Sequence, residues 1–202
     1  TMGAPVFSPA SAVPILPYIA NRWYPTSATQ AAASGLAAAT GLVRLYAFQT
    51  RAAITVSSLM ARVTIVGGGS FQLAIYGNNA ATGRPTGSVI ARTGDMLSTS
   101  AVVVTADITG ADVVLPAGTY WGATNVDASS AAAVFQTLSA NNAAAISPFG
   151  AVDPDLAASA AGAALITLTT PMAYNTWSSM TSATFTEVGG LTGAAHIWLK
   201  AA

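Results

Sequence analysis

The sequence predicts an all-β protein, an antiparallel, jelly-roll-like β-sandwich that follows an extended, Pro-rich N-terminal arm. Short runs of apolar or alternating residues recur at intervals of roughly 10–15 residues, a pattern typical of sandwiches and jelly rolls. Residues that favour turns, chiefly Gly, Asn and Pro, separate these runs. Only 7% of the chain is charged, so either small uncharged side chains form most of its outer surface or other subunits cover much of that surface.

Residues 1–42 form the predicted arm and its Ala-rich connection to the sandwich. The arm begins with a segment of closely spaced prolines, which disfavours both helix and central strand. The same segment is too apolar for a solvated linker. Residues 31–41, broken by Gly35, are expected to form a loop or a single turn. We expect the arm to lie on a partner protein through Val6, Phe7, Ile15, Leu16, Tyr18, Trp23 and Tyr24.

A single sandwich domain is predicted for residues 43–202. Residues 78–87 contain Asn, Gly and Pro and predict a loop, and the glycines at 67–69 predict a turn. The Ala-rich segments 128–145 and 157–164 suit a packed surface of small residues, and the second also suits a helix. Strands are expected at residues 45–48, 54–56, 59–66, 71–76, 88–91, 101–108, 113–115, 119–123, 132–137, 165–168 and 194–200.

The scarcity of charge predicts a protein that associates with copies of itself or with a larger assembly. Seven basic and seven acidic residues give a net charge of zero, and such surfaces tend to associate. Mean hydropathy is +0.54, yet no run of 18 uninterrupted apolar residues is present. We therefore expect no membrane insertion. The arginines are spread singly, so we also expect no binding to nucleic acid.

The residue types needed for most catalytic schemes are scarce. The chain has no cysteine, and its one histidine, His196, fits a strand position near the C-terminus. We therefore expect no transition-metal site and no cofactor. Asp153 and Asp155 form the only close pair of acids; a solvated turn is favoured over a glycosidase pair or a calcium site. The sequence predicts a protein that is not an enzyme.

One group of residues suits ligand binding. Arg84 lies in the predicted loop with Asn78 and Asn79, and sugar sites combine polar loop groups with an aromatic face. Tyr174 and Trp177, with Trp121 as a further candidate, are the aromatic residues considered for that face. The competing interpretation places these aromatic residues in the core or in an interface.

Several segments, taken in order, resemble a β-sandwich module of bacteriophage tail fibres and related virion proteins. The resemblance covers roughly residues 21–126 and includes a strand that ends in Ile-Tyr, a turn with Gly and Pro, and a later L-x-x-G-x-Y-W strand. Thr86 stands where a second glycine often follows the proline. The matching segments are 21–25 (NRWYP), 45–48 (LYAF), 54–62, 73–78 (LAIYGN), 83–87 (GRPTG) and 115–121 (LPAGTYW).

The resemblance implies a non-enzymatic virion component, often trimeric. We therefore expect a short fibre or decoration protein on the particle surface, anchored by its N-terminal arm. Its expected partners are itself, as a homotrimer, and other virion proteins of the capsid or tail. The alternative is the receptor-binding head of a tail fibre, which would bind a host-surface glycan or an envelope protein.

Overall fold

The computed structural model describes residues 17–26, 41–130, 133–135, 165–187 and 195–202. Within them the secondary structure is β-strand, apart from one short 3-10 turn, Ala128–Ser130. No helix in these ranges has the length and apolar character needed to cross a membrane. The strands are β1 (Trp23–Pro25), β2 (Arg44–Thr50), β3 (Ile54–Ile65), β4 (Ser70–Asn79), β5 (Arg84–Arg92), β6 (Met96–Leu97), β7 (Val103–Asp107), β8 (Val113–Leu115), β9 (Gly118–Val126), β10 (Val134–Phe135), β11 (Leu165–Leu168), β12 (Phe185–Glu187) and β13 (Trp198–Ala201).

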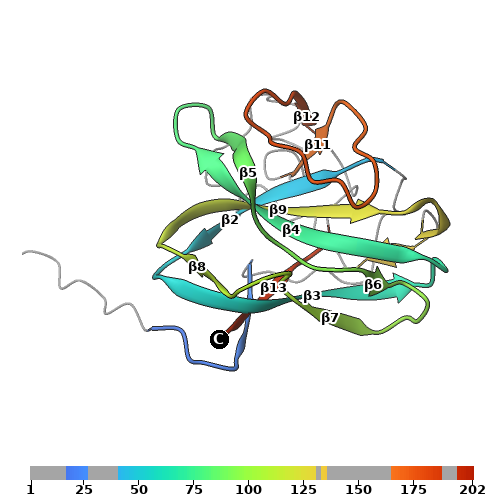
Figure 1. The fold of residues 1–202 in the computed structure, drawn as a ribbon, viewed down its shortest axis with the longest axis horizontal. Coiled ribbons are helices and arrows are strands. Elements are labelled where there is room, and N and C mark those ends of the chain that lie inside the picture. The colour runs from blue at the N-terminus through green and yellow to red at the C-terminus, as the bar shows by residue number, and fades with distance from the viewer. Residues whose placement is uncertain (1–16, 27–40, 131–132, 136–164, 188–194) are drawn as a thin grey trace, which may run out of the picture.

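The described strands form two antiparallel sheets, which confirms the predicted β-sandwich (Figure 1). The six-stranded sheet runs β1-β13-β3-β10, with β7 and β8 paired to β3 as well. The seven-stranded sheet runs β12-β11-β2-β9-β4-β5, with β6 paired to β4. Strands distant in sequence are therefore neighbours in both sheets.

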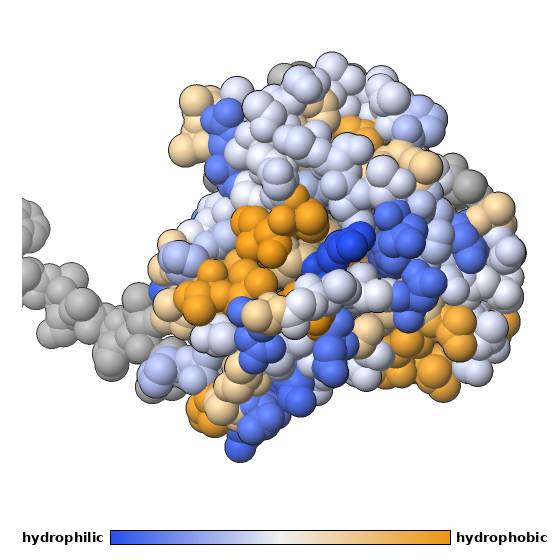
Figure 2. Space-filling model, in the orientation of Figure 1, coloured by the Kyte–Doolittle hydropathy of each residue, from blue (hydrophilic) through white to orange (hydrophobic). Residues whose placement is uncertain are grey.

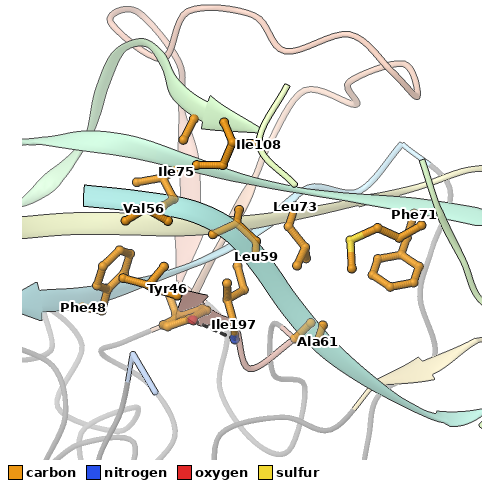
Figure 3. Packing of buried hydrophobic residues seen from close by; sticks show 14 of the residues in the cluster. Tyr46, Phe48, Val56, Leu59, Ala61, Phe71, Leu73, Ile75, Ile108 and Ile197 are labelled. Carbon is orange, nitrogen blue, oxygen red and sulfur yellow. Dashed lines mark hydrogen bonds between the residues drawn. The ribbon is translucent and has the colours of Figure 1, made fainter. Parts of the chain in front are cut away.

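The main core lies between the two sheets. Alternate residues of β4 (Phe71, Leu73 and Ile75) point into it and are fully buried. Opposite them, β3 contributes Leu59 and its neighbours (Figure 3). The hydroxyl of the buried Tyr46 accepts a hydrogen bond of 3.0 Å from the backbone N–H of Ile197, which ties the two sheets together.

The seven-stranded sheet is also buried on its outer face. A loop of residues 169–184, here called the outer loop, connects β11 to β12 on the side of this sheet that faces away from β3 (Figure 1). A second apolar cluster, which includes Tyr76 and Trp121, lies between the sheet and this loop. The alternation in residues 71–76 predicts a half-buried strand, but both faces of the strand are covered because a distant segment packs on the second one.

Several strand boundaries differ from expectation. Residues 54–56 and 59–66 were expected as separate strands, but β3 is continuous from Ile54 to Ile65. The loop predicted for residues 78–87 is much shorter, since β4 ends at Asn79 and β5 begins at Arg84. Pro85 is tolerated in β5 because β5 is an edge strand. The short strands β1, β6 and β12 have no counterpart among the expected strands.

The described part of the predicted arm packs on its own domain. Trp23–Pro25 pairs with Trp198–Lys200 as strand β1, and the Tyr24 hydroxyl accepts a hydrogen bond of 2.7 Å from the N–H of Ile19. The rings of Tyr18 and Tyr24 meet edge to face at 4.7 Å. Other predicted features, namely Val6, Phe7, Ile15, Leu16, residues 31–40, the Ala-rich residues 136–164 and the pair Asp153 and Asp155, lie outside the described residues.

Candidate ligand-binding site on the outer face

Gln72 is the centre of a hydrogen-bond network on the outer face of β4. Its side chain is only 2% exposed, and both the nitrogen and the oxygen of its amide form hydrogen bonds. Nε2 donates to Asp95 Oδ1 and to Asn175 Oδ1, each at 2.9 Å. Oε1 accepts from Nε1 of Trp177 at 2.8 Å. This one side chain therefore fixes two residues of the outer loop to the sheet.

Tyr174 joins the network through a carboxylate. Its hydroxyl donates a hydrogen bond of 2.7 Å to Asp95 Oδ1. Burial raises the pKa of Tyr174 above its usual value, and the neighbouring charges of Asp95 and Asp127 raise it further. Tyr174 is therefore a neutral hydrogen-bond donor at physiological pH. Asp127 is held in place nearby, since its Oδ2 accepts a bond of 2.9 Å from the N–H of Ser70.

Asn125 lies directly opposite Gln72 on the neighbouring strand β9. Its Nδ2 donates to the carbonyl of Ala173 at 3.2 Å, which gives the outer loop a further polar attachment. Asn125 is fully buried, and its Oδ1 has no hydrogen-bond partner. A buried acceptor without a partner costs stability, about 1–3 kcal/mol.

A cavity of about 270 Å³ lies in the outer loop beside this network. Its apolar lining includes Leu168, Met172 and Met180, and the rest of the wall is rich in hydroxyl groups. None of the lining side chains is charged, so the cavity suits a small neutral molecule with several hydroxyl groups. The hydroxyl-bearing residues are Thr170, Thr176, Ser178, Ser179, Ser182 and Thr184.

The five residues predicted to bind a ligand fall into two groups. Tyr174 and Trp177 belong to the network around Gln72. Asn78, Asn79 and Arg84 lie at the other end of β4, where Asn79 pairs with Arg84 across the hairpin between β4 and β5. Gln72 and Asn78 are six residues apart on one strand, a separation of about 20 Å. Trp177 lies between the two groups, because its ring also packs on Tyr76, two residues from Asn78 on the same face of β4.

The hairpin residues and Trp121 have structural contacts. Asn79 Oδ1 accepts the N–H of Ala81 at 2.9 Å, so this side chain stabilises the turn. Asn78 Oδ1 accepts a bond of 3.0 Å from Nε1 of Trp121. Trp121 is 1% exposed, so the idea that it offers a face to a sugar is wrong. It lies in the apolar cluster under the outer loop instead.

His196 lies just before β13 and is 2% exposed. Neither ring nitrogen has a hydrogen-bond partner, and the ring centroid lies 5.5 Å from that of Trp198. Burial lowers the pKa of His196 to about 4, so the ring is neutral at pH 7. Its contacts are those of a core residue. Among the described residues no three His, Asp or Glu side chains come together as a group that could hold a metal ion.

Sequence inspection did not single out Gln72, Asp95 or Asn125. The one signal was a polar residue within an otherwise apolar run, Gln72 between Phe71 and Leu73. Asp95 and Asn175 follow no motif, and only the fold brings them together. No family model matches this chain, and no match to it is found among curated proteins or solved structures.

Proposed function

We propose that the chain is a non-enzymatic bacteriophage virion structural protein, a short fibre or decoration protein on the particle surface. One observation supports this most directly. Two segments of the resemblance, 73–78 and 115–121, meet in the sheet, with Tyr76 opposite Trp121 and Gly77 opposite Tyr120. Motif pieces that are 45 residues apart in sequence thus form one structural unit, as pieces of a common module would.

The arm is the proposed anchor to the particle. Residues 21–26 are fixed to the sandwich by β1 and by the hydrogen bond of 2.7 Å from the Thr26 hydroxyl to the carbonyl of Ile197. The apolar residues upstream, Val6, Phe7, Ile15 and Leu16, are then tethered to the edge of the six-stranded sheet. From that edge the arm would bind a capsid or tail protein, and the subunits would cluster as a homotrimer.

Labelling of whole particles tests this proposal. An antibody against the sandwich, coupled to gold, should label intact virions produced by the genome that encodes the chain. A chain lacking residues 1–16 should fold normally, because Tyr18 and β1 are retained, but should no longer attach to the virion. Virions without label, or attachment that is equal with and without the arm, would contradict the proposal. Light scattering should give a mass three times 20.1 kDa for the proposed trimer.

A second function, receptor binding, is favoured by the cavity in the outer loop. Its uncharged, hydroxyl-rich wall flanks Trp177, and neutral sugars suit such a lining. A glycan array probed with the full chain should then give a signal that Ser182→Phe, which fills the cavity, abolishes. Ser88→Phe, at an exposed position on β5, is the control. A silent array, or a signal that survives Ser182→Phe, would reject this function.

A further inference from the structure

Exposed apolar side chains gather at one end of the sandwich, where β3 leads into β4 and where β6 and β7 are in contact. Among the described residues eight large apolar side chains are exposed, and five of them belong to this surface, here called the end patch. Figure 2 shows hydrophobic surface at the lower right, in the region of β6 and β7. The five residues, with their exposed fractions, are Ile65 (57%), Val66 (46%), Leu97 (59%), Val102 (50%) and Val103 (52%).

Backbone hydrogen bonds hold the segments of the end patch together. The N–H of Gly67, in the turn after β3, donates to the carbonyl of Ser98, just after β6, at 3.0 Å. The N–H of Val63 on β3 donates to the carbonyl of Val102, just before β7, at 2.9 Å. The end of β3 is therefore joined to both β6 and β7, and the exposed side chains of these segments form one surface.

The centre of the end patch contains no charged side chain. Residues 63–70 and 96–106, which form it, include no Asp, Glu, Lys or Arg. Soluble monomers rarely expose an apolar patch larger than a few hundred Å², and five Val, Leu and Ile side chains that are about half exposed reach that size. The end patch therefore has the character of a contact surface for another protein chain.

Arg62 makes one side of the end patch positive. It lies on β3 directly opposite Val103, and its side chain is exposed. Asp107, the acid on β7, lies four residues beyond Val103, about 13 Å along the strand. Its Oδ1 accepts a hydrogen bond of 2.8 Å from Ser58, so this carboxylate is held away from the patch.

Asp95 and Asp127 make the other side of the end patch negative, on the seven-stranded sheet. Asp95 is exposed and stands two residues before Leu97. Leu97 lies opposite Ser70, whose N–H donates to Oδ2 of Asp127 at 2.9 Å. Arg92 is the one base close to Asp95 in sequence, so acids outnumber bases on this side.

We propose that the end patch binds the end patch of a second copy about a two-fold axis. With the axis in the plane of contact, the Arg62 side of each copy meets the Asp95 and Asp127 side of the other, and the two apolar centres meet between them. A contact of this kind uses the same surface on both copies, which must complement itself. The opposite charges on its two sides give the end patch that property and select a second copy as its partner.

The apolar centre and the charged sides have different roles in the contact. Burial of the five apolar side chains provides the affinity. Exposed ion pairs add little affinity but fix the orientation of the two copies and exclude wrong partners. The apolar area is smaller than the roughly 800 Å² per partner of a standard interface. We therefore expect association that is reversible and depends on protein concentration.

This contact goes beyond the proposed virion function and does not require it. A two-fold contact is also distinct from a three-fold cluster, and both can occur in one assembly. Particle labelling tests the virion proposal, whereas sedimentation of the purified chain tests the end patch, so the failure of one is distinguishable from the failure of the other.

Sedimentation of the full-length chain over a range of concentrations is the main experiment. Val102→Asp places a charge in the apolar centre, so it should weaken self-association by roughly tenfold or more and halve the mass of the assembly. Val114→Asp is the matched control, because Val114 is 60% exposed on β8, which pairs with the opposite end of β3. The control should associate as the wild type does. Far-UV circular dichroism should be unchanged in both variants, since both side chains are exposed.

The dependence on salt gives a second readout. Self-association of the wild type should weaken as the salt concentration rises, whereas Arg62→Ala should associate several-fold more weakly and depend much less on salt. A wild type that stays monomeric, or equal association of Val102→Asp and Val114→Asp, would overturn the proposal. A monomeric wild type whose virion labelling is lost in Val102→Asp would also overturn it and would assign the end patch to another virion protein.

Discussion

Nε1 of Trp177 donates a hydrogen bond of 2.8 Å to Oε1 of Gln72, a side chain 105 positions earlier in the sequence. Through this bond the outer loop is attached to β4 of the seven-stranded sheet. The indole ring also packs on Tyr76, with centroids 6.2 Å apart. Trp177 thus covers the apolar cluster and satisfies a buried amide at the same time, which makes Gln72 the key polar residue of this face.

Replacing Gln72 should therefore destabilise the protein strongly. Gln72→Ala breaks three hydrogen bonds and leaves the Trp177 N–H without its partner, at a cost of about 2–4 kcal/mol. Urea denaturation measures the free energy of unfolding. Gln49→Ala is the control, because Gln49 is exposed and makes one long bond of 3.4 Å to Thr119. Equal losses in the two variants would show that the network contributes nothing.

Acidic pH should destabilise the protein partly through His196. Its pKa is about 4 in the folded state against 6.5 ordinarily, so the unfolded chain binds a proton that the folded chain excludes. The contribution of His196 to the free energy of unfolding is fully present above pH 6.5. It is lost as the pH drops toward 4, a decrease of about 3 kcal/mol. Denaturation curves across this range measure the loss.

The variant His196→Phe separates this effect from the titration of carboxyl groups. It retains a ring against Trp198 and removes two buried nitrogens that have no partner, so it should be neutral or stabilising at pH 7. Its stability should fall less than that of the wild type between pH 6.5 and 4. Parallel curves for the two proteins would show that His196 does not drive the loss.

Alkaline pH should unfold the protein through its buried tyrosines. Burial raises the pKa of Tyr46 and of Tyr76 above the usual value of 10, so both stay neutral in the folded state while the unfolded chain ionises. The contribution of these two tyrosines to the free energy of unfolding is fully present below pH 10 and decreases as the pH rises above that value. Tyrosinate absorbance should therefore increase together with the loss of β-structure. Ionisation of all tyrosines while the fold remains intact would contradict this.

Two glycines should differ in how well they tolerate replacement by alanine. A Cβ at Gly67 would lie 2.6 Å from Cβ of Ala133 and 2.9 Å from its backbone nitrogen, so Gly67→Ala forces the backbone apart and should cost about 1–3 kcal/mol. Gly94→Ala meets no atom within 4 Å and should be neutral or slightly stabilising. Thermal unfolding of both variants checks the difference. Similar melting temperatures would mean that Ala133 moves without cost.

The local pattern of apolar residues predicts some of the strands with their correct boundaries. Val113–Leu115 and Leu165–Leu168 have the expected boundaries, because apolar β-branched runs end there at turn residues. Trp23–Pro25 was not expected as a strand, since its proline disfavours pairing and only the edge position beside Trp198 permits it. The burial of both faces of β4 has no local signal at all, because the covering loop is about a hundred residues away.

The same limit applies to the candidate site. Tyr174 and Trp177 are candidates from the sequence because they are aromatic residues, and that requires no knowledge of the fold. Their partners Gln72 and Asp95 lie 105 and 79 positions away, and no spacing rule connects them. Arg84 lies at the opposite end of β4 from Gln72, where it pairs with Asn79, and no local pattern in the sequence indicates its distance from Tyr174.

The position of β13 between β1 and β3 sets an order of events in folding. β1 pairs, among the described strands, with β13 alone, and Thr26 bonds to a carbonyl 171 residues further along the chain. Such distant contacts form late, because a long loop must close before they contribute. Residues 23–26 can take their place only when β13 is in the sheet. The proposed anchor would in this way be offered to a particle by folded molecules and not by incompletely folded ones.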